Sequence, residues 1–137
     1  MTDDAEFALH ARLAVDTFFV ADWMLSRVLL MNELRYAWLI LVPRRNGISE
    51  IHELTTSDRS VLTEEVARAS ASLKEMAGAA KINIGALGNM VPQLHVHVVA
   101  RNPGDPAWPG PVWGHSPARP MEPAQAGLRT AELRSRL

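Results

Sequence analysis

The 137-residue sequence contains no cysteine. Disulfide bonds, thiolate zinc sites and cysteine nucleophiles are therefore excluded, and chemistry must come from histidine, carboxylate and hydroxyl groups or from a ligand. An excess of either charge is also missing, because 14 Lys and Arg oppose 15 Asp and Glu, for a formal net charge of −1. A chain this close to neutral offers no electrostatic footprint for a nucleic acid polymer and no polybasic patch for a membrane.

Long apolar runs are absent as well. No stretch approaches the roughly 18–20 apolar residues that span a bilayer. The first residues, Met1 to Glu6, are acidic, whereas a secretory signal begins with positive charge. We therefore expect a cytoplasmic protein, and the length predicts a single domain over residues 1–137.

The apolar patterning predicts both helices and strands. Thr55, with Asp58 three residues later, is a candidate helix cap, and Gly78 is a suitable helix stop. The final helix is expected to place Ala124, Leu128, Ala131 and Leu133 on one side. The predicted elements are a short helix over 5–15, strands within 17–31 with a break at Ala21–Asp22, a strand over 37–42 that completes a hairpin, a helix over 57–76, a strand from 81 that enters a glycine-containing loop, a strand over 93–101 and a helix over 123–137.

The predicted strand from Gln93 to Arg101 has two different faces. Side chains alternate along a strand, so the apolar Leu94, Val96 and Val98 point one way. The other face carries a row of polar side chains, Gln93, His95 and His97. A strand that only covered a core would not need two imidazoles and a carboxamide in a row, so this face is the candidate site.

These residues resemble the signature of the histidine triad (HIT) superfamily, in which three histidines alternate with apolar residues. Gln93 stands in place of the first histidine. The resemblance extends over about residues 17–115 and includes, in order, Val28-Leu-Leu-Met-Asn32, a strand that ends in Leu-Val-Pro43-Arg-Arg, a long helix, Asn83 and Gly88-Asn89. The segment from Asp105 to Gly114 is similar to a bacterial branch described as diadenosine-polyphosphate-hydrolase-like.

The resemblance implies an α+β, HIT-like fold with a five-stranded, mainly antiparallel sheet. Helix 57–76 would cover one side, and a C-terminal helical tail would occupy about residues 122–137. It implies a homodimer that pairs through a helix and an edge strand. The implied activity is that of a hydrolase or nucleotidyl transferase acting at the α-phosphate of a dinucleoside polyphosphate, a nucleoside phosphoramidate or a similar nucleotide, through a nucleotidyl-histidine intermediate.

The same resemblance assigns roles to individual residues. His95 matches the nucleophile, and His97 matches the residue that hydrogen-bonds phosphate oxygens. Gln93 retains orientation and phosphate contact but has no acid or base function. The expected nucleotide-binding residues are Asn32 at the ribose, Leu30 in the apolar wall for the base, and Asn83, Gly88 and Asn89 near the phosphates. No cofactor is expected to be obligatory, although Mg²⁺ can accompany a polyphosphate substrate.

Several alternatives remain open at this stage. The two histidines can be a half-buried polar pair, or zinc ligands if His10, His52 or His115 supplies a third nitrogen. Met90 stands where some relatives use Ser or Thr, and together with Gln93 it motivates a nucleotide-binding or sensing protein with little or no catalysis. Arg101 is expected either at distal phosphates or exposed at the strand end. Two tryptophans, Trp108 and Trp113, are expected to pack, to form a dimer contact or to edge the nucleotide pocket.

Overall fold

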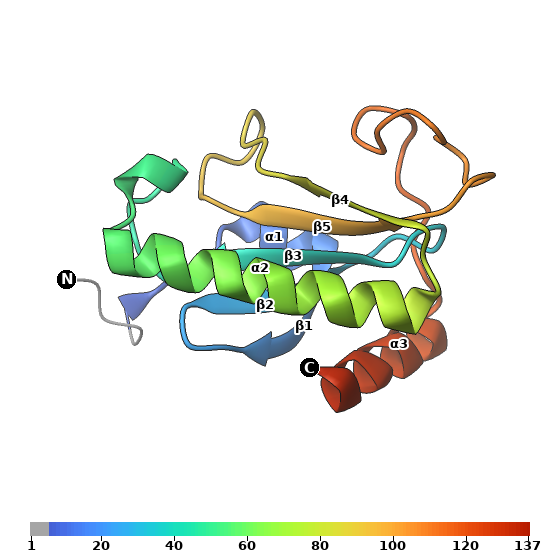
Figure 1. Cartoon of the computed structure of the whole chain (residues 1–137), viewed down its shortest axis with the longest axis horizontal. Helices are drawn as coiled ribbons and strands as arrows, with labels where there is room; N and C mark the ends of the chain where they lie inside the picture. Colours follow the sequence, from blue (N-terminus) through green and yellow to red (C-terminus); the bar gives the residue numbers. More distant parts are fainter. Residues whose placement is uncertain (1–5) are drawn as a thin grey trace.

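A computed structural model describes residues 6–137 of the chain (Figure 1). Residues 1–5, which include most of the acidic start and the first residue of the predicted helix 5–15, lie outside the described residues. The elements are, in order, α1 (Ala11–Asp16), β1 (Thr17–Asp22), β2 (Ser26–Met31), β3 (Trp38–Pro43), the short 3-10 helix η2 (Ile51–Glu53), α2 (Thr56–Ala77), β4 (Lys81–Gly85), β5 (Val96–Arg101) and α3 (Pro123–Arg136).

The five strands form one sheet in the order β1-β2-β3-β5-β4. Every neighbouring pair is antiparallel, which confirms the predicted fold. Strand β5 lies between β3 and β4, so that His97 pairs with Ile40 on one side and with Gly85 on the other. The second histidine of the motif is therefore held in the interior of the sheet.

Alternation along the strands gives the sheet two apolar faces. Helices α2 and α3 cover one face, and α1 lies against the other (Figure 1). Leu39 and Leu41 face α2 and α3, whereas Trp38 and Ile40 face the side of α1. Because the inner strands bury both faces, each fully buried Leu or Ile contributes about 1.5–3 kcal/mol to stability.

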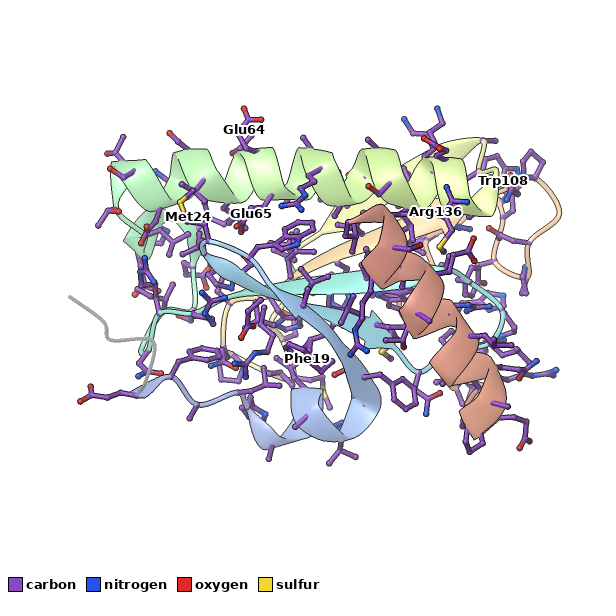
Figure 2. All side chains as sticks on the ribbon, turned by 90° about the horizontal axis from the view of Figure 1, so that it is seen from below. Phe19, Met24, Glu64, Glu65, Trp108 and Arg136 are labelled. Carbon is purple, nitrogen blue, oxygen red and sulfur yellow. The ribbon has the colours of Figure 1, made fainter. Side chains whose placement is uncertain are left out.

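Helix α2 is fixed at both ends and in its middle. The hydroxyl of Thr55 accepts a hydrogen bond from the Asp58 N–H at 3.1 Å, and Gly78 ends the helix with a positive φ of 59°. Glu65 points from α2 toward the sheet while Glu64 points to solvent (Figure 2). The Glu65 carboxylate accepts the backbone N–H groups of residues 25 and 26, both at 3.0 Å. These contacts tie the helix to the start of β2.

The strand that was predicted from Gln93 begins only at Val96. The pairing of β4 with β5 ends at Gly85 and His97, and the pairing of β3 ends at Val96. Residues 93–95 therefore have no strand beside them, and the Leu94 N–H donates to the Ile48 carbonyl at 3.0 Å instead. The expected row of three side chains on one strand face is wrong for this reason.

Helix α3 presents a different face from the one expected. Of the four residues expected on one side, Leu133 is buried, whereas Ala124, Leu128 and Ala131 are exposed. The helix buries Ala126 and Thr130 together with Leu133. Packing against β1 and α2 covers the side of the helix that contains residues 126, 130 and 133. Within residues 6–137, no helix is both long and apolar enough to cross a membrane.

Candidate functional site

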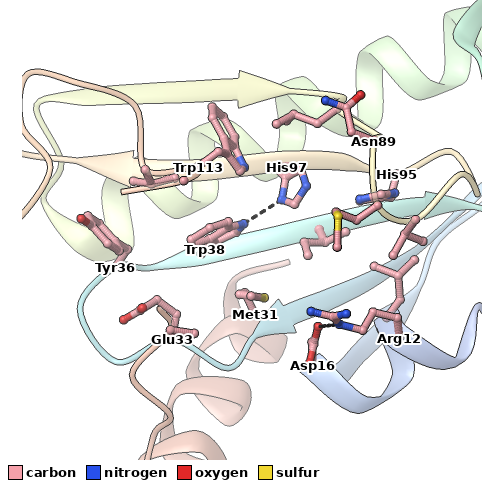
Figure 3. A pocket seen from close by; sticks show the side chains of 18 of the residues that line it. Arg12, Asp16, Met31, Glu33, Tyr36, Trp38, Asn89, His95, His97 and Trp113 are labelled. Carbon is pink, nitrogen blue, oxygen red and sulfur yellow. Dashed lines mark hydrogen bonds and ion pairs between the residues drawn. The ribbon is translucent and has the colours of Figure 1, made fainter. Parts of the chain in front are cut away.

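A cavity of about 430 Å³ opens on the sheet face opposite α2 (Figure 3). This volume lies in the range of about 300–1,000 Å³ that is typical of small-molecule sites. Its lining comes from α1, β2, β3 and the connection between them, and from β5 with the segments before and after it. It includes Leu13, Met31, Tyr36, Trp38, Ile40, His95, His97 and Trp113. Both motif histidines therefore face a largely apolar and aromatic cavity.

His95 is 7% exposed and immediately precedes β5. Its Nδ1 lies 2.7 Å from the main-chain carbonyl oxygen of Gln93. Because a carbonyl oxygen can only accept a hydrogen bond, Nδ1 must carry the proton, which leaves the lone pair of the neutral ring on Nε2. Within residues 6–137 the structure gives Nε2 no hydrogen bond of its own. The ring is thereby oriented with an available nucleophilic nitrogen.

His97 is held by a side chain rather than by the main chain. Its Nδ1 lies 3.0 Å from the indole nitrogen of Trp38, which donates the hydrogen bond (Figure 3). Burial, and secondly the neighbouring His95, lower the pKa of His97 from 6.5 to about 4. The ring is therefore neutral at pH 7.

Aromatic rings surround the two imidazoles. The ring centroids of His95 and His97 are 5.0 Å apart. Trp38 and Trp113 contact the His97 ring edge to face, with centroids 5.7 Å and 5.6 Å away. Tyr36 extends this aromatic wall beyond Trp38, and the centroids of these two rings are 6.3 Å apart. Such a wall suits a flat, partly apolar ligand such as a purine or pyrimidine base.

Of the predicted phosphate-binding residues, Gly88 and Asn89 line the cavity, together with Met90. Gln93 does not. Its side-chain oxygen accepts the His10 N–H at 2.8 Å, and its amide donates to the Ala8 carbonyl at 2.9 Å. Gln93 instead borders a second, more polar groove of about 580 Å³, which His95 also lines.

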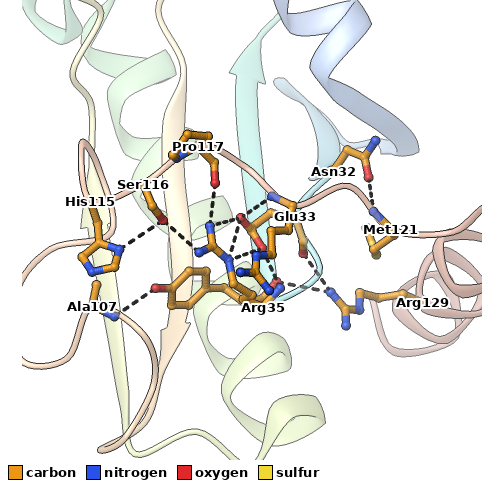
Figure 4. A network of polar contacts seen from close by, with 11 residues as sticks. Asn32, Glu33, Arg35, Ala107, His115, Ser116, Pro117, Met121 and Arg129 are labelled. Atoms are coloured by element: carbon orange, nitrogen blue, oxygen red, sulfur yellow. Dashed lines mark hydrogen bonds and ion pairs between the residues drawn. The ribbon is translucent and has the colours of Figure 1, made fainter.

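The remaining predicted binding residues do not line the cavity. Leu30 is fully buried in the core beneath α2 and α3, on the opposite face of the sheet, so it does not form the wall of this cavity. Asn32 accepts the Met121 N–H at 2.8 Å (Figure 4), which places it against the segment that leads into α3. Asn83 accepts a hydrogen bond from Arg101 at 2.8 Å. Met31 and Ile40 take the lining position that was expected for Leu30.

Arg101 is not exposed, and it does not line the cavity of the two histidines. It is 1% exposed and forms a bidentate pair with Asp105, at 2.7 Å and 2.9 Å. The guanidinium also stacks against Trp108, 5.7 Å from the ring centroid. The segment after β5 is thereby anchored, which positions Trp113 at the cavity.

Glu33 and Arg35, which both line the cavity, form an ion pair within a network of polar contacts (Figure 4). Glu33, 1% exposed, accepts from the Arg35 guanidinium at 2.7 Å and from the Arg119 N–H at 3.1 Å. Burial works against ionisation of Glu33, but hydrogen bonds from the Arg35 side chain and from the Arg35 and Arg119 backbones outweigh it and hold the pKa of the carboxyl below its usual value. Arg12 and Asp16, which also line the cavity, form an exposed pair, 2.9 Å apart.

Sequence reasoning missed these pairs and Trp38. Arg12 and Asp16 stand four residues apart on a helix, which is a recognisable pair spacing. Nothing in the pattern marked Trp38 beyond its apolar strand position, because its partner is 59 residues away. Within residues 6–137, no group of three or more His, Asp or Glu side chains is arranged to hold a metal ion.

The fold and this histidine cavity define a histidine triad type of α+β protein. The model of the HIT domain matches residues 12–104, and the chain belongs to the HIT family. HIT proteins are in general nucleotide-binding hydrolases or transferases. No curated protein matches the sequence.

Solved structures of three histidine triad proteins resemble the chain over nearly its whole length. The protein from Sinorhizobium meliloti is 47% identical with a TM-score of 0.96, and the match covers 98% of this chain and 100% of that one. The protein from Marinobacter aquaeolei is 47% identical with a TM-score of 0.93, and the match covers 96% of each chain. The protein from Bradyrhizobium japonicum is 43% identical with a TM-score of 0.92, and the match covers 95% of this chain and 97% of that one.

Proposed function

We propose that the protein cleaves a nucleotide at its α-phosphate through a covalent nucleotidyl-histidine at His95. The substrates are dinucleoside polyphosphates, nucleoside phosphoramidates or similar nucleotides. The observation that carries the proposal is the hydrogen bond from His95 Nδ1 to the Gln93 carbonyl oxygen, which leaves the lone pair of the neutral ring on Nε2. A neutral, oriented nitrogen of this kind is what in-line attack on phosphorus requires.

The reaction divides into two displacements. First, Nε2 of His95 forms a bond to the α-phosphorus while the bond from phosphorus to the leaving group breaks, and the electron pair departs with the leaving group. Water then attacks the phosphorus and the P–N bond breaks with its electron pair returning to Nε2, so that the neutral ring and the nucleoside monophosphate form while the proton lost by the water passes to solvent. In a transferase reaction another nucleophile would take the place of water. His97 donates to a phosphoryl oxygen in both steps, where negative charge accumulates.

The lining of the cavity supports a nucleoside at one end and phosphates at the other. Met31 and Ile40 offer apolar surface to the base, and Gly88 and Asn89 border the histidines. We propose that Gln93 acts indirectly, by holding the chain around residues 8–10 beside His95. No cofactor of the protein is required by this scheme, and Mg²⁺ would enter with a polyphosphate.

The proposal also includes a homodimer. Strand β4 is an edge of the sheet, and it carries the exposed Ile84, 53% exposed, followed by Leu87, 44% exposed. An open edge strand with apolar side chains is a surface that a second copy can extend. Sedimentation of the purified protein at a monomer mass across micromolar concentrations would contradict the dimer.

The experiment that tests catalysis is trapping of the covalent intermediate. Diadenosine tetraphosphate and adenosine 5′-phosphoramidate are incubated with the protein, the mixture is quenched with denaturant, and peptides are analysed by mass. We expect adenylate on the peptide that contains His95, and we expect neither adduct nor turnover in His95→Ala. Nucleotide binding without any adduct or turnover would support the sensing alternative, and turnover by His95→Ala at the wild-type rate would exclude the proposed nucleophile.

A further inference from the structure

We propose that Trp38 is a positioning residue that holds His97 as a neutral Nε2–H donor, so that His97 binds a phosphoryl oxygen and does not act as the acid for the leaving group. This inference rests on the proposed function for its catalytic part, whereas the tautomer of His97 can be measured without any substrate. It names a role for a side chain that the histidine motif itself does not contain.

The chemistry of the indole group determines the tautomer. An indole nitrogen carries a hydrogen and can only donate. Its 3.0 Å contact with Nδ1 of His97 therefore requires a lone pair on Nδ1, and the single hydrogen of the neutral ring must be on Nε2. Protonation of Nδ1 would bring two N–H groups together inside a buried aromatic cluster. The contact thus disfavours the imidazolium form in addition to burial.

Among residues 6–137, no anionic group offsets this effect at His97. The strand pairs of β5 place Ile40 and Gly85 beside it, and the nearest titratable ring is His95, whose own charge would repel a second one. The charged groups that line the same cavity are already paired: Arg12 with Asp16 and Arg35 with Glu33. Tyr36 also lines the cavity, with its hydroxyl accepting the Ala107 N–H.

Trp113 provides an internal comparison. Its ring contacts His97 at 5.6 Å, nearly the same distance as Trp38. Its buried indole nitrogen, however, has no hydrogen-bond partner within the described part of the chain. Both tryptophans shield His97, but only Trp38 donates to it. Replacement of either tryptophan by phenylalanine keeps an aromatic ring but removes the indole N–H. Only at residue 38 does this also remove a hydrogen bond to His97, so the pair of variants distinguishes shielding from hydrogen bonding.

The consequence concerns the leaving group. A polyphosphate departs as a stable anion and needs no proton, whereas an amine that leaves from a phosphoramidate must gain one. His97 cannot supply it in this tautomer, because Nε2–H is a donor of a neutral ring with a pKa of about 4. Gln93 has no acid to offer. The site is therefore matched to phosphoanhydrides, and for amine leaving groups the proton would have to come from water or from a titratable group of the adjoining groove, which Glu50 and His52 line.

The first test reads the tautomer by long-range ¹H–¹⁵N correlation spectra of histidine side chains. In the wild-type protein we expect His97 to show protonated Nε2 and unprotonated Nδ1 from neutral pH down to about pH 5. In Trp38→Phe we expect a mixture of tautomers and a rise of the His97 pKa by about one unit or more toward its ordinary value. Trp113→Phe should keep the wild-type tautomer. A wild-type spectrum with Nδ1–H, or an unchanged spectrum in a folded Trp38→Phe, would overturn the proposal.

The second test compares leaving groups at fixed pH. Because general acid catalysis contributes about 10²–10⁴ to a rate, we expect kcat for adenosine 5′-phosphoramidate to be at least about 100-fold below that for diadenosine tetraphosphate. The decrease of kcat for the phosphoramidate in His52→Asn shows how much His52 contributes as a proton donor. If the two compounds have equal kcat values in the wild type, and also in His52→Asn, the leaving-group preference is overturned. If neither compound is turned over, the proposed function fails, while the spectra still decide the role of Trp38.

Discussion

The pKa of about 4 for His97 predicts a defined loss of stability in acid. The folded protein binds this proton only near pH 4, whereas the unfolded chain binds it near the ordinary value of 6.5. Between these values the unfolded state holds more protons, so the free energy of unfolding decreases as the pH falls through this window. A gap of about 2.5 pH units corresponds to about 3 kcal/mol, which is a large part of the roughly 5–15 kcal/mol that stabilises a domain.

His97→Asn isolates this contribution. The asparagine oxygen can still accept the hydrogen bond from Trp38, but the side chain takes up no proton. Urea unfolding, followed by circular dichroism at steps from pH 8 to pH 4, gives the free energy of unfolding of both proteins. The difference between the two curves cancels the contributions of the carboxylates and of the other histidines, which both proteins contain. We expect the wild type to lose about 3 kcal/mol more than the variant between pH 6.5 and pH 4.

The same data contain the control and the refutation. Above pH 7 the difference between the two proteins should be constant, because His97 is neutral in both the folded and the unfolded state there. A difference that stays constant down to pH 4 would show that His97 takes up its proton equally in both states. The reasoning from burial and from the Trp38 hydrogen bond would then be wrong.

Two further substitutions test the placement of residues that the motif singled out. Asn32→Ala should lower the free energy of unfolding by about 1 kcal/mol, because the Met121 N–H loses its partner. The Kd for a nucleotide, measured by calorimetry, should stay within about twofold of the wild-type value. A large loss of affinity with unchanged stability would instead support a ribose contact at Asn32. Gln93→Ala should increase amide hydrogen exchange of the backbone N–H of His10, which Gln93 binds at 2.8 Å, and protection that equals the wild type would contradict the anchoring role.

The sequence predicted the sheet and the long helix because those elements are set by local signals. Thr55 and Gly78 mark the ends of α2, and apolar runs mark β2 and β3. The prediction that Leu30 lies on the cavity side of the sheet is wrong for a related reason. The run around it is apolar on both sides, since both faces of the inner strands are buried. Alternation then divides the residues into two sets but does not say which set faces α2.

The predicted start of β5 at Gln93 is wrong for another reason. Alternation of Gln93, His95 and His97 is a property of the sequence, whereas a strand exists only where neighbouring strands supply hydrogen bonds. The neighbouring strands stop pairing at Leu41 of β3 and Gly85 of β4, which lie opposite Val96 and His97. Similarly, Asn32 stands at the position where the family resemblance expects a ribose contact, but its side-chain oxygen accepts a hydrogen bond from the segment before α3. Contacts between residues so far apart in the chain leave no local trace.

The two histidines also differ in how much their state depends on the sequence around them. His95 is fixed by the main-chain carbonyl of residue 93, which every amino acid provides. Replacement of the first motif histidine by Gln93 therefore leaves the orientation of the proposed nucleophile unchanged and removes only what a side chain at that position would do. His97 is fixed by the side chain of Trp38, and among the natural side chains only tryptophan offers an indole N–H that donates and cannot accept. The presence of glutamine instead of histidine at residue 93 is thus expected to remove a proton source, whereas substitution of Trp38 is expected to alter the charge of the site.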